Sequence, residues 1–250
     1  MHDVTIIPVE GLPEVPEAFN LGQAIAGQVQ LADGDIVAVS QKVVSKSEGR
    51  VVRLDQTDPE TEAVNLAART GKDPRLVQQI LEESRSLVRV DEERGILITE
   101  THHGFICANA GIDQSNTADV DQAILLPLDP DGSARRIRVE LETAASVRTA
   151  VVVTDSFGRA WRQGQAEVAI GCAGINPLDD WRGRSDQRGR ELTATVIALA
   201  DQVAAASDLV RTKADGVPAV VVRGLGDHVI EDDGPGCASQ LRDAGEDLFR

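Results

Sequence analysis

Short, almost uninterrupted runs of Val, Ile and Ala constrain the fold of this chain most strongly. They lie at residues 36–39, 151–154 and 217–224. Strands with one face in water alternate apolar with polar residues, whereas near-continuous apolar runs indicate strands that are covered on both faces. The 250 residues are 42% hydrophobic but only 2% aromatic, so the core is expected to be mostly Val, Ile, Leu and Ala. The sequence therefore predicts an α+β or mixed α/β protein.

Apolar residues at helical spacing and shorter strand-like segments complete the expected architecture. We expect helices at residues 20–31, 60–70, 74–88, 143–151 and 191–210, strands at 84–90, 95–100 and 165–173, and a Pro-Asp-Gly turn at 130–132. Neither an internal repeat nor a linker marks a domain boundary. We therefore expect residues 1–250 to form a single domain.

Composition excludes several classes of protein. A net charge of −16 and the scarcity of aromatic residues argue against binding of nucleic acid, which calls for basic surfaces or aromatic stacking platforms. Cys107, Cys172 and Cys237 are far apart and form no CxxC pair, which argues against a zinc ribbon or a disulfide framework. No apolar window reaches the length of a membrane span. We expect a soluble, cytoplasmic protein without a membrane or nucleic-acid partner.

Polar side chains follow two apolar or small-residue stretches. The first, residues 100–116, narrows to Cys-Ala-Asn-Ala-Gly and then offers Asp113, Ser115 and Asn116, and the second places Asp155 and Ser156 after the strand at 151–154. Two neighbouring carboxylates need a cation or a raised pKa. Oxygen ligands from Asp113, Asp155 and Ser156 suit Mg²⁺ or Mn²⁺ better than zinc. We therefore expect a divalent metal site, with Asp113 and Asp155 as the catalytic acidic pair.

Cationic residues are candidates for holding a phosphate near that acidic pair. The chain is poor in Lys, yet Lys42 and Lys46 lie four residues apart after the strand at 36–39, and Lys213 precedes the strand at 217–224. The Walker motif GxxxxGK[ST] is absent, so this is not a P-loop. A metal–nucleotide site that transfers a phosphoryl group would use all these groups. Helix caps or turns for the aspartates and solvated surface positions for the lysines stay open as alternatives.

Other reactive side chains have simpler explanations. Adjacent residues on a strand point to opposite faces, so His102 and His103 are unsuited to sharing one ion, and we expect one packed and one exposed ring. No base is fixed near Cys107, so a buried small residue is the favoured interpretation. Arg159 and Arg162 could clamp an anion or neutralise nearby acidic groups.

The motifs EGLPEV (10–15), SQKVVSKSEGR (40–50), TETHHGFICANAGIDQSN (99–116), VTDSFGRAWRQG (153–164) and GVPAVVVRG (216–224) occur in this order. Together they resemble the coenzyme F420-0:L-glutamate ligase family, also called F420 gamma-glutamyl ligases, over nearly the whole chain. The resemblance implies a mixed α/β fold not built on a P-loop, two intertwined lobes and a homodimer. Some relatives carry a flavin-binding reductase-like domain after this one, and we expect none here because 250 residues leave no room for it.

The resemblance further implies a GTP-dependent ligase that joins L-glutamate to the phospholactate arm of the deazaflavin F420-0 through an acyl phosphate, giving GDP and phosphate. Further glutamates can follow through gamma linkages. Mn²⁺ or Mg²⁺ is implied as the divalent ion, with a monovalent cation such as K⁺. Position by position, the implied metal ligands are Asp113, Asp155 and Ser156, and the implied GTP contacts are Leu12, Pro13, Glu14, Val15, Gln41, Lys42, Lys46, Asn116, Lys213, Ala214, Asp215 and Gly216.

Two functions of other classes use the same residues. A metal-dependent GTP phosphohydrolase would release phosphate from GTP without needing the deazaflavin or glutamate. A non-catalytic nucleotide-binding module would bind GTP without turnover.

Overall fold

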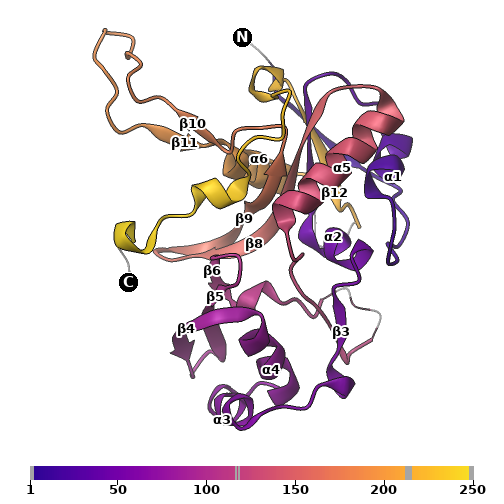
Figure 1. Ribbon diagram of the computed structural model, residues 1–250, viewed down its shortest axis with the longest axis vertical. Coiled ribbons are helices and arrows are strands. Elements are labelled where there is room, and N and C mark those ends of the chain that lie inside the picture. The colour runs from indigo at the N-terminus through magenta and orange to yellow at the C-terminus, as the bar shows by residue number, and fades with distance from the viewer. Residues whose placement is uncertain (1–2, 116, 118, 212–215, 248–250) are drawn as a thin grey trace.

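A five-stranded mixed sheet forms the centre of the molecule (Figure 1). The computed structural model describes residues 3–115, 117, 119–211 and 216–247. The strand order is β1-β12-β2-β8-β9, and only β2 and β8 run parallel to each other. The bounds are β1 Thr5–Val9, β12 Ala219–Arg223, β2 Asp35–Ser40, β8 Thr149–Arg159 and β9 Arg162–Ala173. The mixed α/β fold predicted from the Val-rich runs is confirmed.

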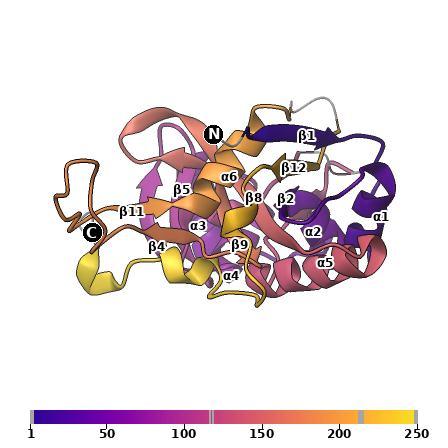
Figure 2. The ribbon, with the colours of Figure 1, turned by 90° about the horizontal axis from the view of Figure 1, so that it is seen from above.

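Helices cover both faces of this sheet, as the apolar runs predict (Figure 2). On one face α1 (Leu21–Gln28) and α5 (Pro130–Ala145) share a core with Val37, Val151 and Val153. On the other face α6 (Leu199–Asp208) packs over the residues next to these in sequence, among them Ile36, Ala150 and Val152. Side chains of a strand alternate between its faces, so each Val-rich strand contributes to two cores.

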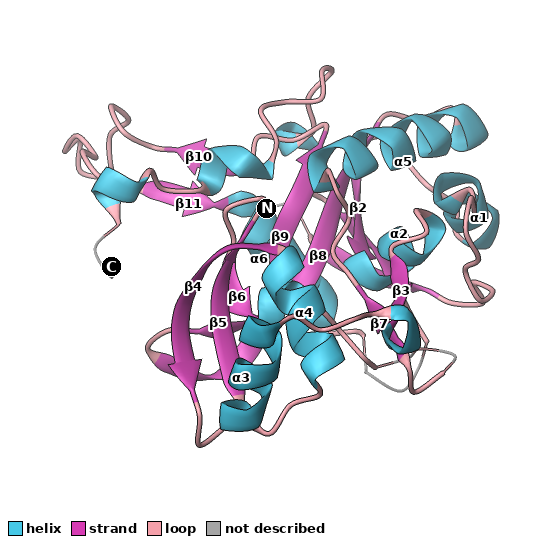
Figure 3. Cartoon of the chain, turned by 60° about the horizontal axis from the view of Figure 1, so that its bottom comes forward, coloured by secondary structure: helices cyan, strands magenta, loops and turns pink. Residues whose placement is uncertain are grey.

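A smaller layer lies below the central sheet in Figure 1 and is displayed from that side in Figure 3. Its three-stranded antiparallel sheet has the order β4-β5-β6 and packs near α3 and α4 over a separate apolar core. A short antiparallel pair, β3 with β7, lies between this layer and α2. The bounds are α2 Gln41–Ser47, β3 Val51–Arg53, α3 Thr61–Thr70, α4 Pro74–Glu82, β4 Ser84–Asp91, β5 Ile96–Thr101, β6 Ile106–Ala108 and β7 Gln122–Ile124.

An arm extends from the body where β10 (Leu178–Asp180) pairs with β11 (Val196–Ala198) (Figure 1). The predicted helix at residues 191–210 is therefore wrong in its first half, and only α6 is helical. The segment Thr193–Thr195, followed by Val196 and Ile197, is rich in β-branched residues, which fit a strand better than a helix. Pairing with β10 then settles the choice.

The structure also corrects the region before β8. The helix expected at 143–151 instead runs from Pro130 to Ala145. Pro is favoured in the first turn of a helix, and the Asp129 side chain accepts a hydrogen bond from the Gly132 amide at 2.9 Å, so the Pro-Asp-Gly sequence begins a helix rather than a turn. Ser146 ends α5 in a left-handed conformation.

None of the described helices combines the length and apolar character that crossing a membrane requires.

Close contact between α1 and α5 gives a stability prediction. A Cβ on Gly22 would lie 2.4 Å from Glu140 Cβ and 2.7 Å from the Leu141 backbone nitrogen, whereas one on Gly27 of the same helix would meet nothing within 4 Å. We expect G22A to lower the free energy of unfolding by roughly 1–3 kcal/mol because the helices must move apart. The control G27A should raise it by up to about 1 kcal/mol through helix propensity. Urea unfolding measures both, and equal effects would contradict the packing argument.

Candidate active site

The candidate site lies where β8 continues beyond its parallel neighbour. β2 pairs with β8 from Asp35–Thr149 to Ser40–Thr154, and beyond that point β8 continues to Arg159 paired only with β9. Asp155 is thus the first residue of β8 past the end of β2. The expectation that the strand ends before Asp155 is wrong. The position is nevertheless the carboxyl end of the parallel pair, where α/β proteins commonly bind ligands.

Helix α2 begins at Gln41, directly after β2, and brings Lys42 and Lys46 to the same edge. The two lysines are four residues apart, so they lie one turn apart on the same side of the helix. Lys42 Nζ lies 2.7 Å from Asp113 Oδ2 and donates a hydrogen bond to Ser115 Oγ at 2.7 Å. Lys46 Nζ lies 2.6 Å from Glu14 Oε1. The sequence analysis did not predict this helix. Its two lysine side chains contact two of the loops that are expected to hold ligands.

A tight turn of small residues precedes Asp113. Asn109, Ala110 and Gly111 all have positive φ angles, of 53°, 55° and 70°. Such a backbone is costly for residues other than Gly, and conformations of this kind cluster at functional sites. Asp113 is then fixed through its backbone, which exchanges two hydrogen bonds with Ile124, at 3.0 and 2.8 Å. The turn and these backbone hydrogen bonds therefore hold the Asp113 carboxylate next to Lys42.

The pKa values of the two aspartates shift in opposite directions overall, although burial raises both. Burial raises the pKa of Asp155 to about 7, and the charges of Glu167 and Asp113 act in the same direction. Burial also raises the pKa of Asp113, but hydrogen bonds from Lys42 and Ser115 outweigh it and lower the pKa overall. A divalent cation between the two carboxylates would remove the cost of ionising Asp155. The donor set of Asp113 and Asp155 therefore fits Mg²⁺ or Mn²⁺.

Ser156 lies on the other face of β8. Val151 and Val153 face the core under α1 and α5, whereas Ala150 and Val152 face α6. Continuing this alternation, Asp155 points to the side of α5, and Ser156 points to the side of α6. There its Oγ donates a hydrogen bond to Glu167 Oε1 at 2.5 Å. The role of Ser156 as a metal ligand stays a prediction, and an ion held by the two aspartates would lie on the opposite face from its hydroxyl.

A cavity of about 280 Å³ adjoins Lys46. It brings together the loop at 12–15 and α2, as the nucleotide prediction requires, and its lining comprises Glu14, Val15, Glu17, Lys46, Gly49, Val51, Thr117, Gln122 and Ile124. Leu12 and Pro13 precede this lining in the same loop.

Of the remaining predicted nucleotide contacts, one is buried, one is exposed, and four lie outside the described residues. The Gln41 side chain is fully buried, and its Oε1 accepts a hydrogen bond from Ser45 Oγ at 3.0 Å, whereas its Nε2 has no hydrogen-bond partner among the described residues. Gly216 is exposed and has a φ of 65°. The other four, Asn116, Lys213, Ala214 and Asp215, lie outside the described residues.

Residues that first suggest chemistry prove to be packed. Burial, with the charge of Asp155, raises the pKa of Cys107 to about 12, so this thiol is no nucleophile at neutral pH. His103 is half-buried and stacks on Phe105, whereas His102 is exposed and bonds to the Glu82 carbonyl at 2.8 Å. One packed and one exposed ring were predicted, and this is confirmed. Arg159 and Arg162 are exposed at the turn between β8 and β9.

The sequence analysis missed Glu167 and its pairing with Arg211. Both are buried beside the site, and Arg211 Nη2 lies 3.1 Å from Glu167 Oε2. The signal was a single acidic residue within the otherwise small and apolar β9 segment AEVAIGCA (166–173). A charge at such a position calls for a buried partner.

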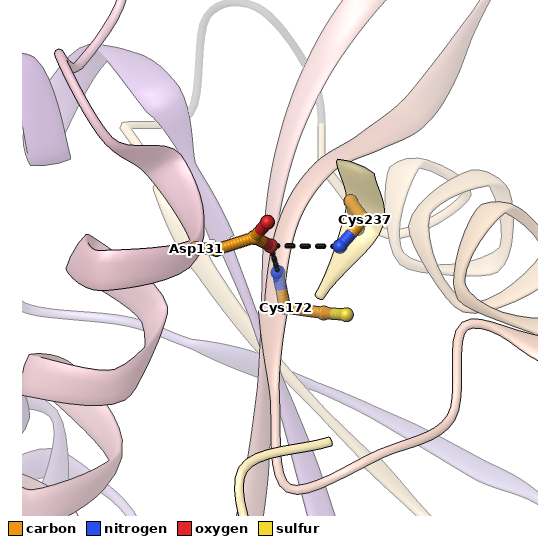
Figure 4. A group of neighbouring side chains, drawn as sticks. All are labelled: Asp131, Cys172 and Cys237. Carbon is orange, nitrogen blue, oxygen red and sulfur yellow. Dashed lines mark hydrogen bonds between the residues drawn. The ribbon is translucent and has the colours of Figure 1, made fainter. Parts of the chain in front are cut away.

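A second group of possible metal ligands, Asp131, Cys172 and Cys237, lies away from this edge (Figure 4). Asp131 Oδ1 accepts hydrogen bonds from the backbone amides of Cys172 and Cys237, both at 2.8 Å. Contact with the Cys172 thiol, together with burial, raises the pKa of Cys237 well above its usual range. Through the two hydrogen bonds that Asp131 accepts, this group connects α5, β9 and the C-terminal segment.

The opposite pKa shifts predict opposite effects on metal-free stability. Folded Asp155 keeps its proton up to a pH of about 7, whereas the usual value is 3.8, so stability falls as the pH rises through this window. In a chelator at pH 8, D155N should therefore be more stable than wild type, by on the order of 2 kcal/mol, and this gain should shrink toward pH 4. D113N should be less stable, because the lowered pKa of Asp113 marks a stabilised anion. Thermal unfolding against pH measures both, and a pH-independent D155N difference would contradict the assignment.

Comparisons with known proteins show the family of the chain. The model of the F420-0:gamma-glutamyl ligase family matches residues 11–224. The chain is 43% identical over 253 residues to the coenzyme F420:L-glutamate ligase of Methanothermobacter thermautotrophicus, with 99% of each chain covered. It is 44% identical over 255 residues to that of Methanopyrus kandleri, with both chains covered completely, and 42% identical over 236 residues to that of Methanocaldococcus jannaschii, covering 94% of this chain and 91% of the relative. The carboxylate pair, the lysines of α2 and the loop at 12–15 all fall within the matched region, and the chain belongs to the F420-0:gamma-glutamyl ligase family.

Proposed function

We propose that this protein is a GTP-dependent ligase that joins L-glutamate to the phospholactate arm of F420-0. The observation that carries the proposal is one edge of the sheet where the half-buried carboxyl groups of Asp113 and Asp155 adjoin two lysines of α2 and a cavity. The relatives carry the name coenzyme F420:L-glutamate ligase, which supplies the acceptor and the amino acid. A homodimer and a monovalent cation such as K⁺ are further parts of this proposal.

The lysines of α2 suit the phosphates of a nucleotide. A lysine is a compact cation that binds phosphate as a point charge. Lys46 is paired with Glu14, whose side chain is 84% exposed, so exchanging this partner for a phosphate oxygen costs little. Lys42 is paired with the half-buried Asp113 and keeps that carboxylate ionised. We infer that Lys46 contacts the phosphates, while Lys42 positions Asp113.

The reaction follows as two balanced transfers. An oxygen of the substrate carboxylate attacks the γ-phosphorus of GTP, and GDP leaves with the electrons of the broken P–O bond. The amine of L-glutamate, after losing a proton, attacks the carbonyl carbon of the acyl phosphate, and inorganic phosphate leaves as the amide forms. A divalent cation, Mn²⁺ or Mg²⁺, held by Asp113 and Asp155 would neutralise charge on the phosphates.

The direct test is a mass-spectrometric assay of the purified protein with the deazaflavin acceptor, L-glutamate, GTP and Mn²⁺. We expect product masses that increase in steps of one glutamate, with one GDP formed per step. D113N and D155N should each lower this activity about 100-fold or more, because each variant keeps only one of the two carboxylates that would hold the divalent cation. Phosphate release without acceptor and glutamate would instead show a GTP phosphohydrolase. Calorimetric GTP binding without turnover would show a nucleotide-binding module.

The role of Lys46 can be tested against a matched lysine. K46M should raise the KM for GTP roughly tenfold or more, because it removes a phosphate contact, and should change unfolding little. K72M is the control, since Lys72 lies between α3 and α4 in the lower layer. Equal KM values for K46M and wild type would contradict the phosphate assignment.

A further inference from the structure

A buried ion pair on the α6 side of β8 has no part in the reaction as described. Arg211 Nη2 lies 3.1 Å from Glu167 Oε2, and the side chains are only 7% and 9% exposed. Burying two charges is costly, and such pairs contribute little net stability compared with apolar residues of the same volume. Stability alone is therefore a weak reason for this pair.

The pair holds together parts of the chain that are far apart in sequence. Arg211 Nη2 also donates hydrogen bonds to Thr154 Oγ1 at 3.0 Å and to Ser207 Oγ at 2.9 Å. A single guanidinium group thus connects β8, β9 and the end of α6. Arg211 also comes shortly before Lys213, Ala214, Asp215 and Gly216 in sequence, which the sequence analysis assigns to GTP.

Glu167 bridges Arg211 to Ser156. Ser156 and Glu167 are direct partners across the β8–β9 ladder, so their side chains lie on the same face. The Ser156 hydroxyl donates its hydrogen to Glu167 Oε1, which directs the oxygen lone pairs away from Glu167. Hydrogen bonds of this kind orient residues that contact a metal or a substrate.

We propose that Glu167 and Arg211 are positioning residues that fix Ser156 and the start of the segment after α6 in one arrangement against β8. Resting on the proposed function, this means that one buried pair keeps β8, which carries Asp155 and Ser156, in register with the end of α6. Neither residue contacts the reacting atoms. Loss of the pair therefore weakens GTP binding through misplacement of both parts rather than through a lost contact.

E167Q tests the link in two ways. In the ligand-free protein, hydrogen exchange of the peptides containing Ser156 and Arg211 should accelerate together. In the presence of Mn²⁺, the Kd for GTP from calorimetry should rise roughly 10–100-fold, the range typical of residues that orient a ligand-binding group. The matched control is D35N, which removes the charge from the Arg223–Asp35 pair, with a 2.7 Å separation, at the opposite end of β2 from the site. It should leave both readouts unchanged.

The double variant E167Q/R211M separates positioning from stability. Removing both charges relieves the uncompensated arginine that E167Q leaves buried, so the melting temperature should recover toward that of wild type. The Kd for GTP should stay elevated, because Ser156 and the segment after α6 are no longer connected. Recovery of GTP affinity along with the melting temperature would overturn the proposal, since the pair would then be merely structural.

Failure of the proposed function is distinguishable from failure of this inference. A wild-type protein that binds GTP but forms no glutamate product contradicts only the ligase assignment. An E167Q protein with wild-type GTP affinity, or with unchanged exchange at both peptides, overturns the positioning role whatever reaction the protein catalyses.

Discussion

The parallel pairing of β2 with β8 is the constraint on which the site depends. Both strands are buried on their two faces, so their register is fixed by two separate cores. The register brings the end of β2, and with it the start of α2, level with Thr154. A slip of one residue would exchange the faces of Asp155 and Ser156 and would remove Asp155 from the side of Asp113. The geometry of the polar site therefore depends on the apolar packing that fixes this register.

Beyond that register point, β8 divides the polar groups between its two faces. Asp155 shares one side with Asp113 and Lys42, and Ser156 shares the other with Glu167 and Arg211. On each side a cation offsets part of the acidic charge, Lys42 at 2.7 Å from Asp113 and Arg211 at 3.1 Å from Glu167. Asp155 has no cation within ion-pair distance among the described residues, which agrees with its pKa of about 7. The uncompensated carboxyl is the one that a ligand cation would stabilise most.

Much of this arrangement could be predicted from residue patterns, because it depends on local chemistry. The Val-rich runs predicted strands covered on both faces, and the two cores on either side of the sheet confirm this. Helix α2 escaped prediction because its seven residues, Gln41–Ser47, are too few to display an apolar period. The Thr- and Val-rich segment at 193–197 was misjudged because its strand partner at Leu178–Asp180 is distant in sequence. The pairing of Glu167 with Arg211 joins residues 44 apart, and no sequence pattern specifies it.

The separation of the faces also explains why adjacent residues carry different physical demands. Position 155 needs a carboxyl group whose pKa burial raises to about 7. Position 156 needs only a hydroxyl group that donates a hydrogen bond to the buried Glu167. A carboxylate at position 156 would meet Glu167 directly and would compete for Arg211, whereas Thr would keep the hydroxyl and its hydrogen bond. Conversely, Ser at position 155 would remove the charge that distinguishes this edge from an ordinary strand end. Because side chains alternate along β8, Asp155 supplies negative charge on one face of the strand, and Ser156 makes an orienting hydrogen bond on the other.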